Sequence, residues 1–234
     1  MIQQDEFPYL FEEVVQQDCY HLREVPFQPD VVLDIGANVG VFTTYAAFLF
    51  PKAKVYSIEP NRRNRELLKK YTQHIPNVQA FPCVIGTGTI WHKSPEFTGP
   101  PYYEGGHQYL SHNQLGMSEE WLKSQPGYKS QHFVSVPLSF LVNTLTKPTD
   151  KVLAKIDIEG AENSIFNHEP SMAALRRLDY VAMEIHYGVD GTGPVYLKGN
   201  PTIRERLLSL SDTHECVLIP ELNYFQATKR QTHD

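Results

Sequence analysis

The sequence contains little that would suit a disulfide-bonded secreted protein or a zinc protein. Its 234 residues include only three cysteines, Cys19, Cys83 and Cys216. They are scattered, odd in number and without metal-ligand spacing, which argues against a disulfide framework and a zinc site. No apolar run approaches the length needed to cross a bilayer, and the N-terminus lacks the basic and apolar regions of a secretory signal. We therefore expect a cytoplasmic protein with no membrane partner.

The chain also lacks an excess of positive charge. Lys and Arg number 21 against 27 Asp and Glu, which gives a formal net charge of −6. Proteins that bind a phosphate backbone need basic residues in excess on one face, so we expect no nucleic-acid partner. A small neutral or cationic partner fits this charge better. There is no internal repeat or low-complexity tract, and the length predicts a single domain over residues 1–234.

Strand-like and helix-like segments alternate along most of the chain. Residues 31–35 are typical of a buried strand, and residues 41–50 of a helix that stops before Pro51. We expect four further strands at 53–59, 77–86, 151–160 and 178–188, helices at 62–75, 161–169 and 203–210, and a closing strand pair at 215–220 and 222–228. This alternation predicts a largely parallel sheet with helices on both faces.

Two segments stand outside this pattern. Residues 1–30 are expected to contain a helical segment that packs on the core, caps the pocket or binds a partner. Its helical apolar spacing is seen at Phe7, Leu10, Phe11 and Val14. Residues 87–134 form a long insertion rich in Pro, Gly, Tyr and His. Loops of this length in compact domains are usually functional or disordered, so we expect a substrate loop or lid, with a surface excursion as the alternative.

The turn after the first strand is unusual. In the stretch VVLDIGANVGVFTT, Gly36 and Gly40 would let the backbone approach a ligand at the carboxyl end of the strand. A dinucleotide fingerprint would need glycine in place of Asn38 and Val41, which disfavours a nicotinamide-dependent dehydrogenase. Asp34 would repel a pyrophosphate but accept hydrogen bonds from a cationic or amino-bearing ligand. The turn therefore indicates a ligand with a sulfonium and an amino-acid moiety.

The segment LDIGANVG resembles motif I of the class I S-adenosylmethionine-dependent methyltransferases. Together with SIEPN (57–61), KIDIEGAE (155–162) and MEIHYG (183–188), it resembles the FkbM family, over about residues 31–188. The resemblance implies an α/β fold, a doubly wound, mostly parallel, Rossmann-like sheet of seven strands with helices on both faces. It also implies methyl transfer from S-adenosylmethionine, most often to a hydroxyl of a sugar, a glycan or a secondary metabolite.

The resemblance also implies the residues that would hold the cofactor. It places four residues around the methionine part: Asp34, Gly36, Asn38 and Gly40. Glu59 at the end of the second strand would bind the ribose hydroxyls, and Pro60 and Asn61 would shape the adenine side. The simpler interpretations are a plain tight turn for the glycines and a solvated strand end for Glu59.

Ionisable residues gather at the ends of the fourth and fifth strands. Period-two alternation puts them on shared faces: Lys155, Asp157 and Glu159 on one strand, Glu184 and His186 on the next. Because a hydroxyl acceptor needs a general base or a metal within reach, we expect Asp157 or His186 as the base, with Glu159 and Glu184 orienting the acceptor. An ion pair between Lys155 and Glu184 and a core position for His186 remain alternatives.

The sequence leaves alternatives for the presence of a metal, for the acceptor pocket and for catalytic turnover. A divalent Mg or Mn ion would take its ligands from Asp157, Glu184 and His186. Aromatic rings stack on sugar faces, so part of the insertion is expected to line the acceptor pocket or else to pack on the domain. The residues concerned are Tyr102, Tyr103, His107 and Tyr109. The alternative function is a cofactor-binding scaffold module without turnover, and the sequence leaves the oligomeric state undetermined.

Overall fold

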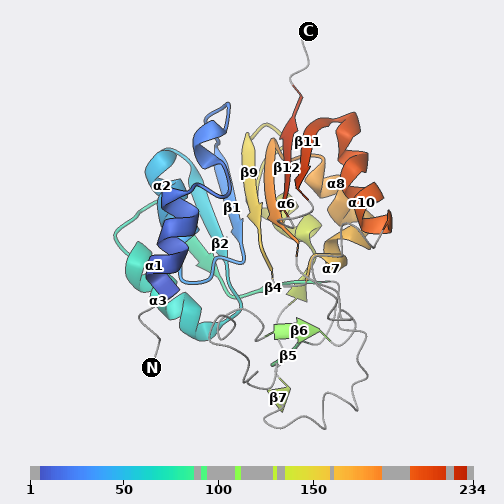
Figure 1. The fold of residues 1–234 in the computed structure, drawn as a ribbon. Helices are drawn as coiled ribbons and strands as arrows, with labels where there is room; N and C mark the ends of the chain where they lie inside the picture. Colours follow the sequence, from blue (N-terminus) through green and yellow to red (C-terminus); the bar gives the residue numbers. More distant parts are fainter. Residues whose placement is uncertain are drawn as a thin grey trace.

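The computed structural model describes residues 6–86, 91–93, 109–111, 129–130, 135–158, 161–185, 201–219 and 224–230. Within these residues, seven strands form one sheet in the order β11-β12-β10-β9-β1-β2-β3 (Figure 1). They are β1 (Val31–Ile35), β2 (Lys54–Ile58), β3 (Val78–Phe81), β9 (Val152–Ile156), β10 (Tyr180–Glu184), β11 (His214–Ile219) and β12 (Tyr224–Lys229). Within this seven-stranded sheet, only the pairings of β12 with β10 and with β11 are antiparallel. The predicted mostly parallel seven-stranded sheet is confirmed.

Helices cover both faces of this sheet, as Figure 1 shows. The described helices are α1 (Glu6–Phe11), the π-helical turn η1 (Glu12–Gln16), the 3-10 turns η2 (Leu22–Glu24) and η4 (Ser209–Asp212), α2 (Val41–Leu49), α3 (Arg62–Thr72), α6 (Leu138–Leu145), α7 (Asn163–Phe166), α8 (Glu169–Leu175) and α10 (Pro201–Leu208). Alternate strand residues such as Leu33 and Val32 enter two separate cores. The first core is closed by α6, α7, α8 and α10, and the second by α2 and the N-terminal segment.

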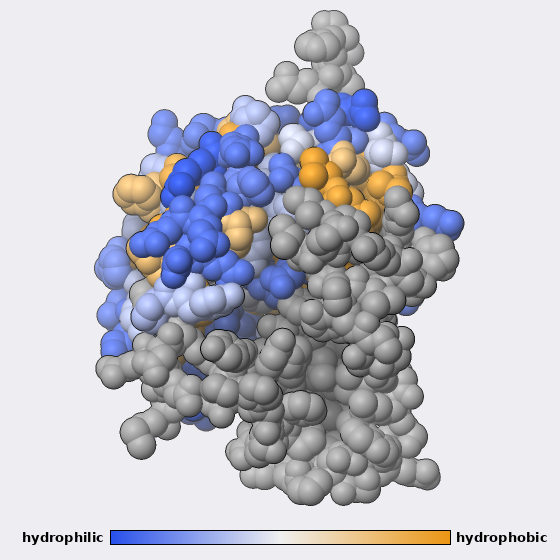
Figure 2. All heavy atoms as spheres, in the orientation of Figure 1, coloured by the Kyte–Doolittle hydropathy of each residue, from blue (hydrophilic) through white to orange (hydrophobic). Residues whose placement is uncertain are grey.

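The N-terminal segment packs on the core, as expected. Val14, Tyr20 and Leu22 are buried in the second core, against Phe42 and Tyr45 of α2. The outward surface on the α1 and α2 side is mostly hydrophilic (Figure 2). Of the residues that defined the apolar spacing, Val14 is buried and Leu10 packs against the same core, whereas Phe11 is 41% exposed. In the part of the chain that the structure describes, none of the helices has both the length and the apolar character to cross a membrane.

Several expected boundaries were wrong. The strand expected at 77–86 is divided into β3 and β4 (Val84–Ile85), and β4 pairs with β8 (Ser135–Val136) in a separate small sheet. Pro82 stands at the break, because proline has no N–H for a ladder. The strand expected at 151–160 ends at Ile156. Sequence analysis missed α6 and placed one helix at 161–169, where the structure has α7 followed by α8.

The insertion is not wholly a loop. Three short strands, β5 (Trp91–Lys93), β6 (Tyr109–Ser111) and β7 (Lys129–Ser130), pair in the order β6-β5-β7. The rest of residues 87–134 lies outside the described residues, so the expectation of a substrate loop stays a prediction.

Candidate functional site

The candidate site lies at the carboxyl ends of the parallel strands β2, β1, β9 and β10, the lower edge of the sheet in Figure 1. In open parallel sheets, ligands bind beyond this edge, where the strand order reverses. Here β1 is followed by β2 on one side, and the chain returns to β9 on the other. The turns after these strands carry most of the predicted residues.

The turn after β1 is held by the protein's own backbone. Gly36 has a φ of +84°, and a Cβ placed there would lie 1.6 Å from the carbonyl oxygen of Asp157. The backbone N–H of Asp157 donates to the carbonyl of Ile35 (2.9 Å), which draws the two strand ends together. Gly40 has a φ of +91°, and a Cβ there would lie 2.9 Å from Leu68 Cδ1. Internal packing therefore requires glycine at position 36, and the positive φ favours glycine at both positions, in addition to the ligand approach that the sequence suggested.

Glu59 connects two turns. Its carboxylate accepts from the backbone N–H of Asn38 (2.9 Å) and from that of Asn61 (2.7 Å), and its side chain is only 6% exposed. Burial raises the pKa of Glu59 to about 7, although both N–H donors act to lower it. The interpretation of Glu59 as a solvated strand end was therefore wrong. The carboxylate oxygens keep lone pairs for further donors such as ribose hydroxyls.

A buried polar row crosses the sheet one layer above this edge. Asp34 stands in register with Ser57 on β2 and with Lys155 on β9. Thr43 of α2 donates to Asp34 Oδ2 (2.5 Å), and its hydroxyl lies 2.8 Å from that of Ser57. Asp34 is fully buried, which raises its pKa against the opposing effect of Lys155. Its Oδ1 atom has no hydrogen-bond partner among the described residues.

Lys155 contacts both the buried polar row and the residues at the strand edge. Its Nζ donates to the carbonyl of Gly36 (2.6 Å) and lies 3.7 Å from Asp34 Oδ1 and 3.2 Å from Asp157 Oδ2. Burial acts to lower the pKa of Lys155, but the carboxylates of Asp157 and Asp34 outweigh it and raise that pKa. Glu184 contributes in the same direction. Lys155 is therefore an ammonium that holds β1, the glycine turn and the end of β9 together.

Asp157 directly follows β9, so the strand is shorter than expected, but its carboxylate lies beside Lys155 as the alternation predicted. Its side chain is 22% exposed, and its Oδ2 also accepts from the hydroxyl of Tyr20 (3.1 Å). Sequence reasoning missed Tyr20, because nothing local relates positions that are 137 residues apart. Glu184 ends β10 on the same side of the sheet, because Ala182 is in register with Lys155 and Glu184 follows it by two residues.

Several predicted residues lie outside the described residues: Glu159, His186, Tyr102, Tyr103 and His107. Tyr109 lies in β6, of which the structure describes only the backbone. Among the described residues, no group of three potential ligands could hold a metal ion. Because His186 is not among them, the Mg or Mn site stays a prediction.

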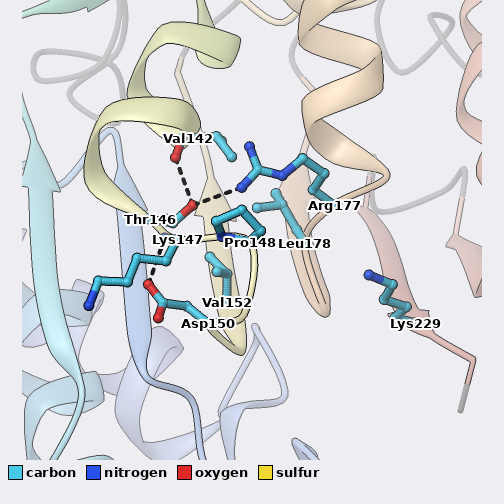
Figure 3. A pocket seen from close by; sticks show the side chains of 9 residues that line it. All are labelled: Val142, Thr146, Lys147, Pro148, Asp150, Val152, Arg177, Leu178 and Lys229. Carbon is cyan, nitrogen blue, oxygen red and sulfur yellow. Dashed lines mark hydrogen bonds between the residues drawn. The ribbon is translucent and has the colours of Figure 1, made fainter.

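The charge of the described site suits a cationic ligand. Asp34, Glu59 and Asp157 converge here, and the buried cation among them is Lys155. A pocket elsewhere in the molecule contains none of these residues (Figure 3). It is lined by residues such as Thr146, Arg177 and Lys229, near the start of β9. The acidic carboxyl edge is therefore the candidate site.

Sheet order, glycine turn and acidic strand end together define the fold of the class I S-adenosylmethionine-dependent methyltransferases. A Streptococcus mutans protein solved in complex with SAH shares this fold, with a TM-score of 0.51 and 12% identity over 93% of this chain and 97% of that one. The family model described as Methyltransferase FkbM domain matches residues 34–211. The chain therefore belongs to the FkbM methyltransferase family.

Curated relatives align over very different lengths. Hexuronic acid methyltransferase AglP of Haloferax volcanii is 24% identical over 204 residues, which cover 87% of this chain and 76% of that protein. The 31-O-demethyl-FK506 methyltransferase FkbM of Streptomyces tacrolimicus is 38% identical over 56 residues, which cover 24% of this chain and 22% of that protein. Two further relatives, 34% identical over 79 and 90 residues, are matched over only 4% and 34% of their own length.

Proposed function

We propose that this protein is an S-adenosylmethionine-dependent O-methyltransferase that acts on a hydroxyl of a sugar, a glycan or a secondary metabolite. The observation that carries the proposal is the acidic strand edge where the glycine turn, Glu59 and Asp157 meet. Two relatives are named as methyltransferases of a hexuronic acid and of 31-O-demethyl-FK506, which supports the proposal. The partner in this proposal is a small-molecule or glycan acceptor in the cytoplasm.

The residues present fit the cofactor. S-adenosylmethionine supplies an electrophilic methyl group on a cationic sulfonium. Glu59, whose carboxylate is already oriented by two backbone N–H groups, would accept from the ribose hydroxyls. The excess of carboxylates at the strand edge would favour the cationic methionine part. The turn from Gly36 to Gly40 would provide backbone groups beside it.

Asp157 is the proposed general base. Methyl transfer to oxygen depends first on holding the acceptor in line with the methyl group, and then on removing the hydroxyl proton. Asp157 directly follows β9, and its Oδ2 atom lies 3.2 Å from the Lys155 ammonium, which holds the carboxylate at the strand edge. Glu184 would orient the acceptor from β10, and His186 is the alternative base.

Calorimetric titration with S-adenosylmethionine and S-adenosylhomocysteine tests the cofactor assignment. We expect saturable binding that Glu59→Ala weakens at least tenfold. Glu66→Ala on α3 is the matched control, because Glu66 is exposed and pairs only on the surface with Arg62. Absence of binding, or equal losses in the two variants, would contradict the proposal. Repeating the titration with a chelator tests the metal.

Turnover is tested separately with a panel of sugar and natural-product hydroxyl acceptors. Methyl transfer that Asp157→Asn reduces strongly, with cofactor affinity retained, would support the proposed enzyme. Binding of the cofactor without methyl transfer to any acceptor would instead favour a scaffold module.

A further inference from the structure

The N-terminal segment reaches the candidate site through one side chain, Tyr20. Its hydroxyl donates to Asp157 Oδ2 at 3.1 Å, and the residue is only 6% exposed. The segment runs beside α2 on the side of the sheet that carries Asp34, Lys155 and Glu184. Neither the family match, which begins at residue 34, nor the sequence motifs include Tyr20.

The surrounding structure holds the Tyr20 ring rigidly. Its edge packs against Phe42 of α2, with ring centroids 5.4 Å apart and an interplanar angle of 86°. Lys155 Nζ lies 5.6 Å from the centre of the same ring. The backbone carbonyl of Tyr20 accepts from the hydroxyl of Tyr180 on β10 (3.0 Å). The phenol is therefore fixed from α2, β9 and β10 at once.

The turns around Tyr20 add to this rigidity. Asp18 and His21 both have a φ of 53°, in the left-handed region. The carboxylate of Asp18 accepts from the backbone N–H groups of Leu22 and Arg23, each at 3.0 Å. These bonds close the chain tightly on either side of Tyr20, so its hydroxyl arrives at Asp157 in one orientation.

Two donors converge on a single oxygen of Asp157. Tyr20 and Lys155 contact Oδ2 from different elements, at 3.1 Å and 3.2 Å. Burial, followed by the charges of Asp157 and Glu184, raises the pKa of Tyr20 well above its ordinary value, so the phenol remains a donor at any assay pH. Donors to an ionised carboxylate form strong bonds and restrict its rotation.

We propose that Tyr20 is a positioning residue of the active site, which orients the carboxylate of Asp157 for proton removal from the acceptor. This inference rests on the proposed function of Asp157 as general base. It makes the N-terminal segment, which lies before the matched family domain, a working part of the catalytic centre.

The test compares two phenol-to-phenyl variants and a double-mutant cycle. Tyr20→Phe keeps the ring but removes the hydrogen bond to Asp157. Tyr180→Phe is the matched control, because it removes a hydroxyl that tethers the same segment without touching Asp157. The assay is methyl transfer to the acceptor identified by the panel, with kcat and the KM for S-adenosylmethionine measured separately.

We expect Tyr20→Phe to lower kcat about tenfold, as for the loss of one charge-assisted hydrogen bond, with KM changed less than twofold. Tyr180→Phe should leave kcat within about twofold. In an Asp157→Asn background, Tyr20→Phe should have almost no further effect on kcat. Equal losses in the two phenyl variants, or additive losses in the cycle, would show that Tyr20 only anchors the segment.

A second readout separates this inference from the proposed function. Thermal unfolding of the same four proteins in the cycle reports the contact between Tyr20 and Asp157 without any substrate, and we expect non-additive midpoints. If the protein binds no S-adenosylmethionine, the proposed function fails and the positioning role fails with it. If binding and turnover occur but Asp157→Asn leaves kcat unchanged, only the roles of Asp157 and Tyr20 are overturned.

Discussion

Replacement of Gly36 by alanine should destabilise the protein more than the same change at Gly40. Both residues have a positive φ, +84° and +91°. Alanine in the left-handed region costs about 1–2 kcal/mol at either site. The two sites differ in what the added methyl group meets, which is the Asp157 carbonyl oxygen at 1.6 Å for Gly36 and the Leu68 Cδ1 atom at 2.9 Å for Gly40.

The difference follows from what can move. Leu68 presents the far end of a flexible side chain, which can change rotamer at small cost. The carbonyl of Asp157 belongs to the backbone, and the backbone N–H of the same residue donates to the carbonyl of Ile35. The added methyl group must therefore push the ends of β1 and β9 apart. Overpacking of this kind costs about 1–3 kcal/mol or more. We therefore expect Gly36→Ala to cost about 2–5 kcal/mol and Gly40→Ala about 1–2 kcal/mol.

Urea denaturation of the two variants beside the unmodified protein measures this difference. The gain from lower unfolded-state entropy is the same for both substitutions and cancels in the comparison. A total stability of about 5–15 kcal/mol leaves the milder variant folded at room temperature. Equal midpoints for Gly36→Ala and Gly40→Ala would refute the role assigned to the Asp157 backbone.

Three further predictions concern the buried charges of the site. The pKa of Glu59 is about 7 in the folded protein and 4.5 in the unfolded chain, so between these pH values the folded protein binds the extra proton. Glu59 should therefore lower the free energy of unfolding by about 3 kcal/mol as the pH rises from 4.5 to above 7. Denaturation at pH 5 and pH 8 should show this fall in the free energy of unfolding, and Glu59→Gln should reduce it. An unchanged pH dependence in the variant would contradict the prediction. Lys155→Met should cost about 3–5 kcal/mol because it removes the ammonium that pairs with the carboxylates of Asp34 and Asp157. Lys151→Met should cost less than about 1 kcal/mol, because the Lys151 side chain is 60% exposed in its pair with Asp179. Similar urea midpoints for the two variants would argue against the buried cluster. Thr43→Val should cost about 1–3 kcal/mol through the lost donor to Asp34, and a neutral result in thermal unfolding would show that water replaces the hydroxyl.

Local signals predicted the strands and helices around the turn from Gly36 to Gly40 well. The run of apolar residues in β1 and the stop at Pro51 both act within a few residues. Where the local signal was weak, the prediction failed. Strand β9 was extended past Ile156 because charged residues continued its alternation, although the strand ends at Ile156 in the structure.

By itself, the sequence determined the alternation of strands and helices, the glycine turn and the acid at the end of β2, because each depends on neighbouring residues. Only the tertiary structure decided what surrounds these groups. The register of β1 with β9 sets Asp34 against Lys155, and the packing of the N-terminal segment brings Tyr20 to Asp157. Such contacts depend on how distant segments fill one another's space, and no local propensity encodes that choice.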